Sequence, residues 1–318
     1  MKKPLIILTG PTAVGKTELS IKLARAINGE IISADSMQVY KHMDIGTAKI
    51  KQSEMGGIKH YLIDEFSPHE DFNVVKFKEY AEKYMSEIYE KHKIPIIVGG
   101  TGFYIQAVLY GIDFEKNEED TSSTTSYRKE LEALAQEKGS VYLHSMLLKV
   151  DPQSAQSIHP NNIKRVIRAL EYYHQTGSKI SNHNEEQRHK DSPYQFCYYV
   201  LNNKREILYN RIDMRVDDMI KQGLMDEVKQ LLDMGCKKDM VSMQGLGYKE
   251  IISYLEGECT LEEAVYIIKR DTRHFAKRQL TWFKREKDVI WVNKDQYNDD
   301  ENKILEAMIN EIHHKQIV

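Results

Sequence analysis

The stretch Leu5–Thr17 reads LIILTGPTAVGKT and decides the fold. Its apolar run, Leu5–Leu8, predicts a buried β-strand. The next part, Gly10–Thr17, fits the pattern G-x-x-x-x-G-K-[ST]. Apolar residues then recur every four positions from Leu19 to Ile27, which predicts a helix that ends at a C-cap glycine, Gly29. A glycine-rich loop between a strand and a helix is a typical site for binding phosphate groups.

We call Gly10–Thr17 the phosphate loop. Its glycines allow several backbone N–H groups to point inward, and the helix N-terminus adds positive potential. Lys16 supplies a cation, and the Thr17 hydroxyl is an expected oxygen ligand for Mg²⁺. The pattern is specific for phosphate or diphosphate but does not identify the compound. The expected binding residues are Gly10, Pro11, Thr12, Ala13, Val14, Gly15, Lys16 and Thr17.

Short apolar runs alternate with helical patterns as far as Gly111, which is typical of parallel βαβ units. We therefore predict an α/β fold of the P-loop NTPase type, a parallel sheet flanked by helices. The expected strands are Leu5–Leu8, Ile31–Ser33, Ile94–Val98, Tyr194–Leu201 and Val289–Val292, and helices are expected at Phe72–Lys91 and from Thr260 through Trp282.

The pattern changes after Gly111. Glu115–Ser126 is acidic and then rich in Ser and Thr, as in a linker, and a helical pattern follows from Tyr127 to Gly177. A polar loop is expected from there to Pro193. We predict a P-loop core formed by residues 1–114 and 194–318, with an all-helical domain, residues 115–193, inserted into it.

Composition excludes several protein classes. The chain has 318 residues, of which 41% are hydrophobic, so wholesale disorder is excluded. No apolar run reaches the roughly 18 residues of a membrane span, and we expect a cytoplasmic protein, a monomer with no evident protein partner. The three cysteines, Cys197, Cys236 and Cys259, are far apart, so neither a disulfide framework nor a zinc site is expected.

Two further polar residues follow predicted strands. Ligands bind open parallel sheets beyond the carboxyl ends of the strands, where Asp35 and Thr101 should lie near the phosphate loop. Asp35 suits either a general base or metal partner, or an N-cap, and position alone does not choose between them. Thr101 is either a hydroxyl contact to a substrate or, more commonly at such a place, a turn residue.

The net charge of −3, from 45 basic and 48 acidic residues, argues weakly against a polyanionic partner. That sum hides a basic segment, Lys269–Lys287, in which eight Lys and Arg residues face two acidic residues. Trp282 and Phe283 interrupt the charges, as in nucleic-acid-binding surfaces, although core packing is the alternative for these rings. A second cationic patch is formed by Lys164, Arg165 and Arg168.

Arg211 and Arg215 lie four residues apart on one predicted helix. A pair with this spacing can bind a diphosphate through bidentate contacts. Surface ion pairs with Asp213, Asp217 or Asp218 fit the spacing equally well.

Together these features resemble the tRNA dimethylallyltransferase family, along nearly the whole chain. The similar stretches are GPTAVGKT (Gly10–Thr17), SADSMQVYKHMDIGTAK (Ser33–Lys49), HYLID (His60–Asp64), IIVGGTGFY (Ile96–Tyr104), HPNNIKRVIRALE (His159–Glu171), RIDMRVDDMIKQGLMDEV (Arg211–Val228), GLGYKE (Gly245–Glu250) and AKRQLTWFK (Ala276–Lys284). The phosphate loop is common to many families. GTAK, GGTGFY and KRQ-x-TWF in this order are far more specific.

The resemblance implies transfer of a dimethylallyl group from dimethylallyl diphosphate to N6 of adenosine 37, next to the anticodon of tRNA. The phosphate loop would hold the diphosphate, with Arg211 and Arg215 contacting it, and Asp35 would be the general base. Thr101 would contact substrate. The residues expected at the tRNA anticodon stem-loop are Ser36, Met37, Gln38, Arg128, Lys164, Arg165, Arg168, Lys277, Arg278, Gln279, Trp282 and Lys284.

Three other functions remain open from sequence. A P-loop kinase of a nucleotide or small metabolite would explain the phosphate loop but not the two basic patches. An enzyme that prenylates free adenine nucleotides would explain the loop and Asp35. A noncatalytic RNA-binding protein with a vestigial loop would explain the basic patches, but not the joint presence of Lys16, Thr17 and Asp35.

Overall fold

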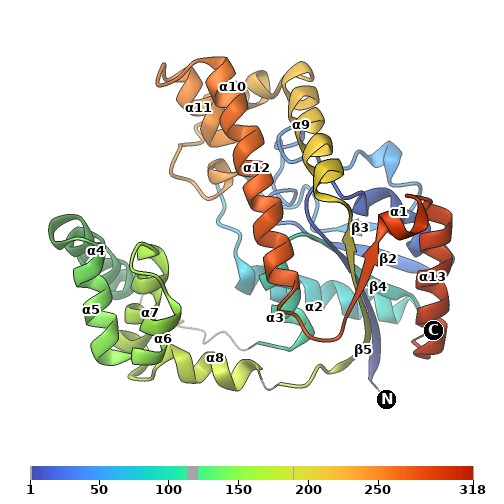
Figure 1. Cartoon of the computed structure of the whole chain (residues 1–318), viewed down its shortest axis with the longest axis horizontal. Coiled ribbons are helices and arrows are strands. Elements are labelled where there is room, and N and C mark those ends of the chain that lie inside the picture. Colours follow the sequence, from blue (N-terminus) through green and yellow to red (C-terminus); the bar gives the residue numbers. More distant parts are fainter. Residues whose placement is uncertain (1, 113–120, 189, 318) are drawn as a thin grey trace. The chain divides into compact units, whose positions relative to one another are not determined.

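The computed structural model describes residues 2–112, 121–188 and 190–317 (Figure 1). The chain divides into two compact units. The first comprises Met1–Leu109 with Pro193–Val318, and the second, the inserted unit, comprises Tyr110–Ser192. The limits expected from sequence were 115 and 193. Part of the predicted linker, residues 115–120, lies outside the described residues, and its remainder belongs to a helix that begins at Thr121.

The first unit is built on a parallel sheet, in which the described residues form six strands in the order β3-β2-β4-β1-β5-β6. The predicted parallel α/β fold is therefore confirmed. One strand was missed, because two residues are too few to show an alternating pattern. The strands are β1 (Lys3–Thr9), β2 (Gly29–Ala34), β3 (His60–Tyr61), β4 (Ile94–Gly99), β5 (Tyr194–Asn202) and β6 (Val289–Asn293).

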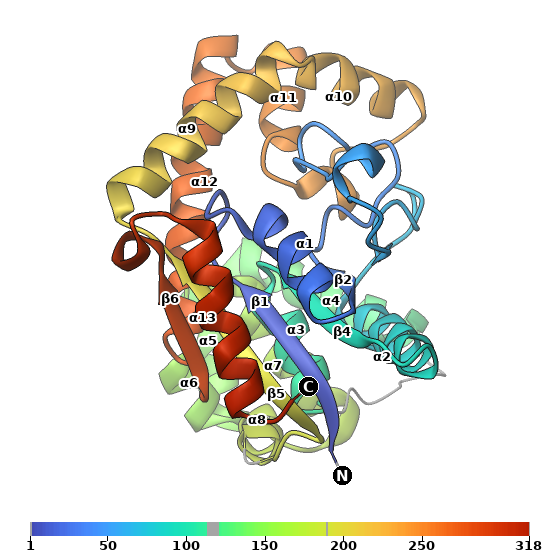
Figure 2. The same ribbon diagram turned by 90° about the vertical axis from the view of Figure 1, so that its right-hand side faces the viewer.

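Helices cover both faces of the sheet, which is why the middle of β1, Leu5–Leu8, is a continuous apolar run. α1 (Lys16–Ala26) and α13 (Glu301–His314) lie on one face, and α2 (Val74–Glu90) and α3 (Gly102–Leu109) lie on the other (Figure 2). Leu8 of β1 is fully buried in the core under α1 and α13. The sheet is thus a rigid base for the loops at its carboxyl edge.

The predicted C-cap at Gly29 is wrong. α1 ends at Ala26, Asn28 takes the left-handed conformation with φ 52°, and Gly29 is already the first residue of β2. A Cβ on Gly29 would lie 2.7 Å from the side chain of Ile96. Close packing against β4 therefore explains this glycine.

Four more helices follow β5 in the first unit. They are α9 (Arg205–Lys221), α10 (Leu224–Asp233), α11 (Tyr248–Leu255) and α12 (Leu261–Phe283). The predicted capping box opens α12, because the Thr260 side chain accepts from Glu263 N and the Glu263 carboxylate accepts from Thr260 N. Short 3-10 turns occupy Gln52–Glu54, Ser242–Gln244 and Lys294–Tyr297. Within the described ranges, no helix is long and apolar enough to cross a membrane.

The inserted unit is helical throughout its described residues. Its helices are α4 (Thr121–Lys138), α5 (Ser140–Val150), α6 (Pro152–Ser157), α7 (Ile163–Thr176) and α8 (Ile180–Arg188). A separate apolar core holds them together, with Leu131, Leu147 and Val166 fully buried. As predicted, α7 ends at Gly177, whose φ is 68°.

The polar loop expected before Pro193 contains α8 instead. The cause is a distant residue, the fully buried Asp151. Its carboxylate accepts Ser154 N at 3.0 Å, which caps α6, and also accepts Ser181 N at 3.0 Å and Ser181 Oγ at 2.7 Å in α8. Burial alone would raise the pKa of Asp151, but these hydrogen bonds lower it below its ordinary value.

We expect Asp151→Ala to destabilise the inserted unit by about 3 kcal/mol, because it leaves buried donors on Ser154 and Ser181 unpaired. Since the pKa of Asp151 is lowered in the folded state, its contribution is present at neutral pH and is lost as the pH falls below that pKa. Thermal unfolding and amide exchange of α6 and α8 measure the effect. Asp191→Ala, an exposed carboxylate in the same unit, is the control. Equal stability of the two variants at neutral pH would contradict the assignment.

Candidate functional site

Three neighbouring strands end level with one another beside the phosphate loop. In the register of the sheet, Gly99 of β4 lies between Thr9 of β1 and Ala34 of β2. The Thr9 hydroxyl donates to Gly99 O at 2.6 Å, and Thr101 N donates to Ala34 O at 3.2 Å. The phosphate loop, Asp35 and Thr101 therefore emerge side by side, as predicted.

The phosphate loop has the backbone that its glycines imply. Gly10, Ala13 and Gly15 take positive φ values of 147°, 63° and 96°. A Cβ on Gly10 would lie 2.5 Å from Leu201 O, so the loop approaches the end of β5 more closely than another residue would allow. Lys16 Nζ donates to Gly10 O at 3.0 Å and to Pro11 O at 2.9 Å. The lysine is thereby held over the loop.

Gln279 of α12 holds the phosphate loop through its side-chain amide. Its Oε1 accepts Thr12 N at 2.9 Å, and its Nε2 donates to Gly100 O at 3.0 Å. The side chain is 6% exposed. Gln279 was expected to contact RNA, but its amide is committed to the two loops instead. Its nearest sequence signal was the motif KRQ-x-TWF, which does not reveal the partners.

Charges of both signs meet at the phosphate loop. The pKa of Lys16 is lowered to about 8, first by burial and then by the nearby positive charge of Arg215, while Asp35 acts in the opposite direction. Burial of the guanidinium likewise lowers the pKa of Arg215, again opposed by Asp35. Lys16 is partly buried and Arg215 is exposed, so both side chains remain accessible to an anion. Two cations and one carboxylate thus share the site.

Arg215 reaches this position because other residues bind its neighbours. Asp213 pairs with Arg273 at 2.5 Å and Asp217 pairs with Lys269 at 2.6 Å, so α9 is fastened to α12. Arg211 lies 3.7 Å from Asp299. The alternative pairing of Arg211 and Arg215 with the aspartates of their own helix is absent from the described residues.

Asp35 caps a turn and not a helix, so the N-cap alternative is wrong, while its role as a general base stays a prediction. Its Oδ1 accepts Met37 N at 2.9 Å and Gln38 N at 3.3 Å, which closes a turn. No hydrogen bond within the described part of the chain involves the other carboxylate oxygen, so a proton acceptor is available. The side chains of Asp35, Ser36, Met37 and Gln38 are partly buried, and Thr101 precedes α3 with its hydroxyl unpaired among the described residues.

The basic segment divides into two parts. Lys269, Arg270 and Arg273 pair with Asp217, Asp271 and Asp213. In the part of the chain that the structure describes, no ion pair involves the exposed remainder, which consists of Lys277, Arg278, Lys284, Arg285 and Lys287. The unpaired cations therefore lie at the end of α12 that carries Gln279.

The two aromatic residues of this segment differ. Phe283 is fully buried in the core. Trp282 is half-buried beside Gly102, its ring centroid lies 6.2 Å from that of Phe103, and its Nε1–H has no partner among the described residues. Core packing thus explains Phe283 but not the indole N–H of Trp282.

In the inserted unit, Lys164, Arg165 and Arg168 share the exposed face of α7, opposite the buried Val166 and Leu170. Arg128 differs, because its Nε donates to Glu171 Oε1 at 2.9 Å and its Nη2 pairs with Glu171 Oε2 at 2.5 Å. Glu171 is 1% exposed. Arg128 therefore forms a bidentate ion pair within the unit while its side chain stays 47% exposed, and its contact with RNA stays a prediction.

A known protein family matches most of this chain. The IPP transferase family model matches residues 38–286. The chain belongs to the IPP transferase family. It is 65% identical to the tRNA dimethylallyltransferase of Lachnoclostridium phytofermentans, over 99% of both chains, and 55% identical to that of Clostridioides difficile, over 95% of this chain and 96% of that one.

Solved structures agree with this membership of the family. The tRNA isopentenylpyrophosphate transferase of Bacillus halodurans matches with a TM-score of 0.73 at 44% identity, over 99% of this chain and 98% of that one. A eukaryotic dimethylallyltransferase acting on tRNA matches with a TM-score of 0.81 at 30% identity, over 98% of this chain and 80% of that one.

We expect Gln279→Leu to weaken the binding of inorganic diphosphate by about tenfold, because Thr12 N and Gly100 O lose their partners and the phosphate loop loosens. Titration calorimetry measures the affinity. Thr281→Val, on the exposed side of the same helix, is the matched control. An unchanged affinity in a folded Gln279→Leu protein would contradict the bracing role.

Proposed function

We propose that this chain transfers the dimethylallyl group of dimethylallyl diphosphate to N6 of the adenosine next to the anticodon of tRNA. The observation that carries the proposal is that Asp35 follows a strand that ends level with the phosphate loop, in a chain of the IPP transferase family. A site for diphosphate and a carboxylate beside it are what an alkyl transfer to a weak nitrogen nucleophile requires.

The proposed reaction joins two substrates at this edge of the sheet. The N6 lone pair is delocalised into the adenine ring, and the base is stacked in its loop, so it must be flipped out to react. As the C–N bond forms at the allylic carbon, the C–O bond to diphosphate breaks and Asp35 takes the N6 proton. Lys16, Arg215 and the backbone N–H groups of the phosphate loop stabilise the charge on the departing diphosphate.

Mg²⁺ fits the site only as an ion shared with substrate. The described residues contain no cluster of three or more His, Cys, Asp or Glu side chains that could hold a metal. Mg²⁺ commonly takes one or two protein oxygens together with substrate phosphates and water. The exposed Thr17 supplies one such oxygen, and the ion would neutralise diphosphate charge.

Two cationic surfaces suit the tRNA. One consists of Lys277, Arg278 and Lys284 with the half-buried Trp282 in the first unit, and the other of Lys164, Arg165 and Arg168 in the inserted unit. Unpaired Lys and Arg side chains bind phosphates by releasing counterions, whatever the sequence. The accessible part of the Trp282 ring would add stacking on an unpaired base. We expect the turn Ser36–Gln38, which follows Asp35, to contact the flipped base.

Labelled dimethylallyl diphosphate, incubated with tRNA or with AMP, tests the proposal. We expect label on tRNA alone. For Asp35→Asn we expect unchanged tRNA affinity and a single-turnover rate lower by about 100-fold or more, because the amide still accepts from Met37 N but cannot take a proton. Label on AMP would favour a free-nucleotide enzyme, and ATP-dependent phosphate release without tRNA would favour a kinase. A near-normal rate for Asp35→Asn would overturn the base assignment.

We expect the double variant Lys277→Ala, Arg278→Ala to weaken tRNA binding and to lower the slope of log affinity against log salt by about 1 to 2, because two phosphate contacts are lost. Gel-shift titration over a salt series measures the slope. The matched control is Lys303→Ala, Lys315→Ala, which removes the same charge from α13 and its end. Equal slopes for the two double variants would contradict the proposed RNA surface.

A further inference from the structure

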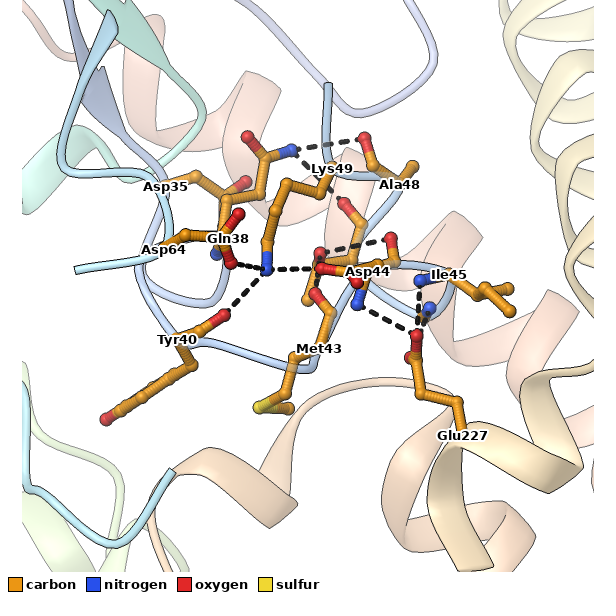
Figure 3. Close-up of polar contacts among 12 residues, drawn as sticks. Asp35, Gln38, Tyr40, Met43, Asp44, Ile45, Ala48, Lys49, Asp64 and Glu227 are labelled. Carbon is orange, nitrogen blue, oxygen red and sulfur yellow. Dashed lines mark hydrogen bonds and ion pairs between the residues drawn. The ribbon is translucent and has the colours of Figure 1, made fainter. Parts of the chain in front are cut away.

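The segment Asp35–Lys49 has a fixed path although it contains neither a helix nor a strand longer than one bridge. Lys49 organises its second half. The Lys49 ammonium, in a side chain 3% exposed, donates to Tyr40 O at 2.7 Å, to Asp44 Oδ1 at 2.6 Å and to Asp64 Oδ1 at 2.5 Å (Figure 3). One buried cation thus joins three points of the chain.

A carboxylate from another element completes the arrangement. Glu227, in the first turn of α10, accepts Asp44 N at 2.8 Å, Ile45 N at 2.7 Å and Gly46 N at 3.0 Å (Figure 3). Its fourth donor is the Tyr248 hydroxyl at 2.7 Å. Successive backbone N–H groups that converge in this way form a nest for an anion, and the anion here is a side chain of the protein itself.

Glu227 serves this segment specifically. Every hydrogen bond that its carboxylate makes in the described structure goes to residues 44–46 or to Tyr248. Other residues of α10 pack the helix against the core, namely the fully buried Val228 and Leu231. Gly46 is required by the same contact, since a Cβ there would lie 2.5 Å from the Tyr248 ring.

The nest is linked to Asp35 through Gln38. The Gln38 Nε2 donates to Thr47 O at 3.1 Å and to Ala48 O at 3.4 Å, directly after the residues that Glu227 binds. The Gln38 backbone N donates to Asp35 Oδ1 at 3.3 Å. Hydrogen bonds and the short backbone segments between them therefore connect α10 to the carboxylate beside the phosphate loop.

We propose that Glu227, with Tyr248, is a positioning residue for the prenyl transfer. It holds the turn at residues 44–48, which in turn fixes Gln38 and the Asp35 carboxylate where the flipped adenine is read and deprotonated. The diphosphate side of the site is built by other residues, so Glu227 acts on the RNA side alone. This inference rests on the proposed function.

Glu227→Gln tests the inference, because it removes the charge and places an NH₂ group against backbone N–H groups while α10 remains intact. We expect single-turnover transfer to tRNA to fall by about 100-fold, the usual effect of a small misplacement at a reacting centre. The affinity for inorganic diphosphate should stay within twofold of wild type, and the amides of Asp44, Ile45 and Gly46 should exchange faster with solvent. Tyr248→Phe, which removes one hydrogen bond, should lower transfer by about fivefold.

Glu263→Gln is the matched control, since Glu263 also accepts a backbone N–H, that of Thr260, at an exposed site outside this segment. It should transfer at the wild-type rate. Transfer by Glu227→Gln within twofold of wild type would overturn the inference, as would an equal loss of transfer and diphosphate affinity, which a general structural defect produces. Wild-type protein that transfers no label would overturn the proposed function and this inference together.

Discussion

The site depends on an electrostatic balance at the ends of three parallel strands. Lys16 and Arg215 are both cationic and lie close enough for Arg215 to lower the pKa of Lys16. Two cations in crowded surroundings repel each other, and nearby negative charge offsets that repulsion. Asp35 supplies part of that charge, and a diphosphate would supply the rest. The arrangement is therefore suited to an anionic leaving group with a proton acceptor at its side.

The surrounding structure holds these charges in place. Gln279 ties the phosphate loop to the loop that carries Thr101, and ion pairs with α12 hold α9, the helix that carries Arg215. On the other side, the network of Lys49 and Glu227 sets the path of the segment after Asp35. Because these groups are held in place beforehand, the two substrates can meet in a reactive geometry without rearrangement of the protein.

Short local patterns in the sequence are enough to predict part of the site. The phosphate loop, Asp35 and Thr101 follow strands whose apolar runs are plain, and a parallel sheet brings such ends together. β3 has two residues and gives no pattern, and α8 begins where a polar loop was expected because Asp151, thirty positions earlier, binds Ser181. Long-range contacts of this kind leave no local signal.

The same limit applies to individual site residues. Gln279 and Arg128 lie in stretches that resemble RNA-contacting motifs, yet their hydrogen bonds are made to Thr12, Gly100 and Glu171 within the protein. Three of the eight cations in the basic segment are neutralised by aspartates of α9 and α12. A pattern of charges predicts that a surface is cationic only after its ion-pair partners are known.

The pH dependence of diphosphate binding tests the electrostatic balance most directly. The affinity of wild-type protein for inorganic diphosphate, relative to that of Lys16→Arg at each pH, should fall as the pH rises past about 8, because Lys16 loses its proton there whereas arginine keeps its charge. Taking the ratio removes the titration of the ligand itself. A ratio that stays constant between pH 7 and pH 10 would contradict the account, since Lys16 would then be an ordinary lysine that neither Arg215 nor burial perturbs.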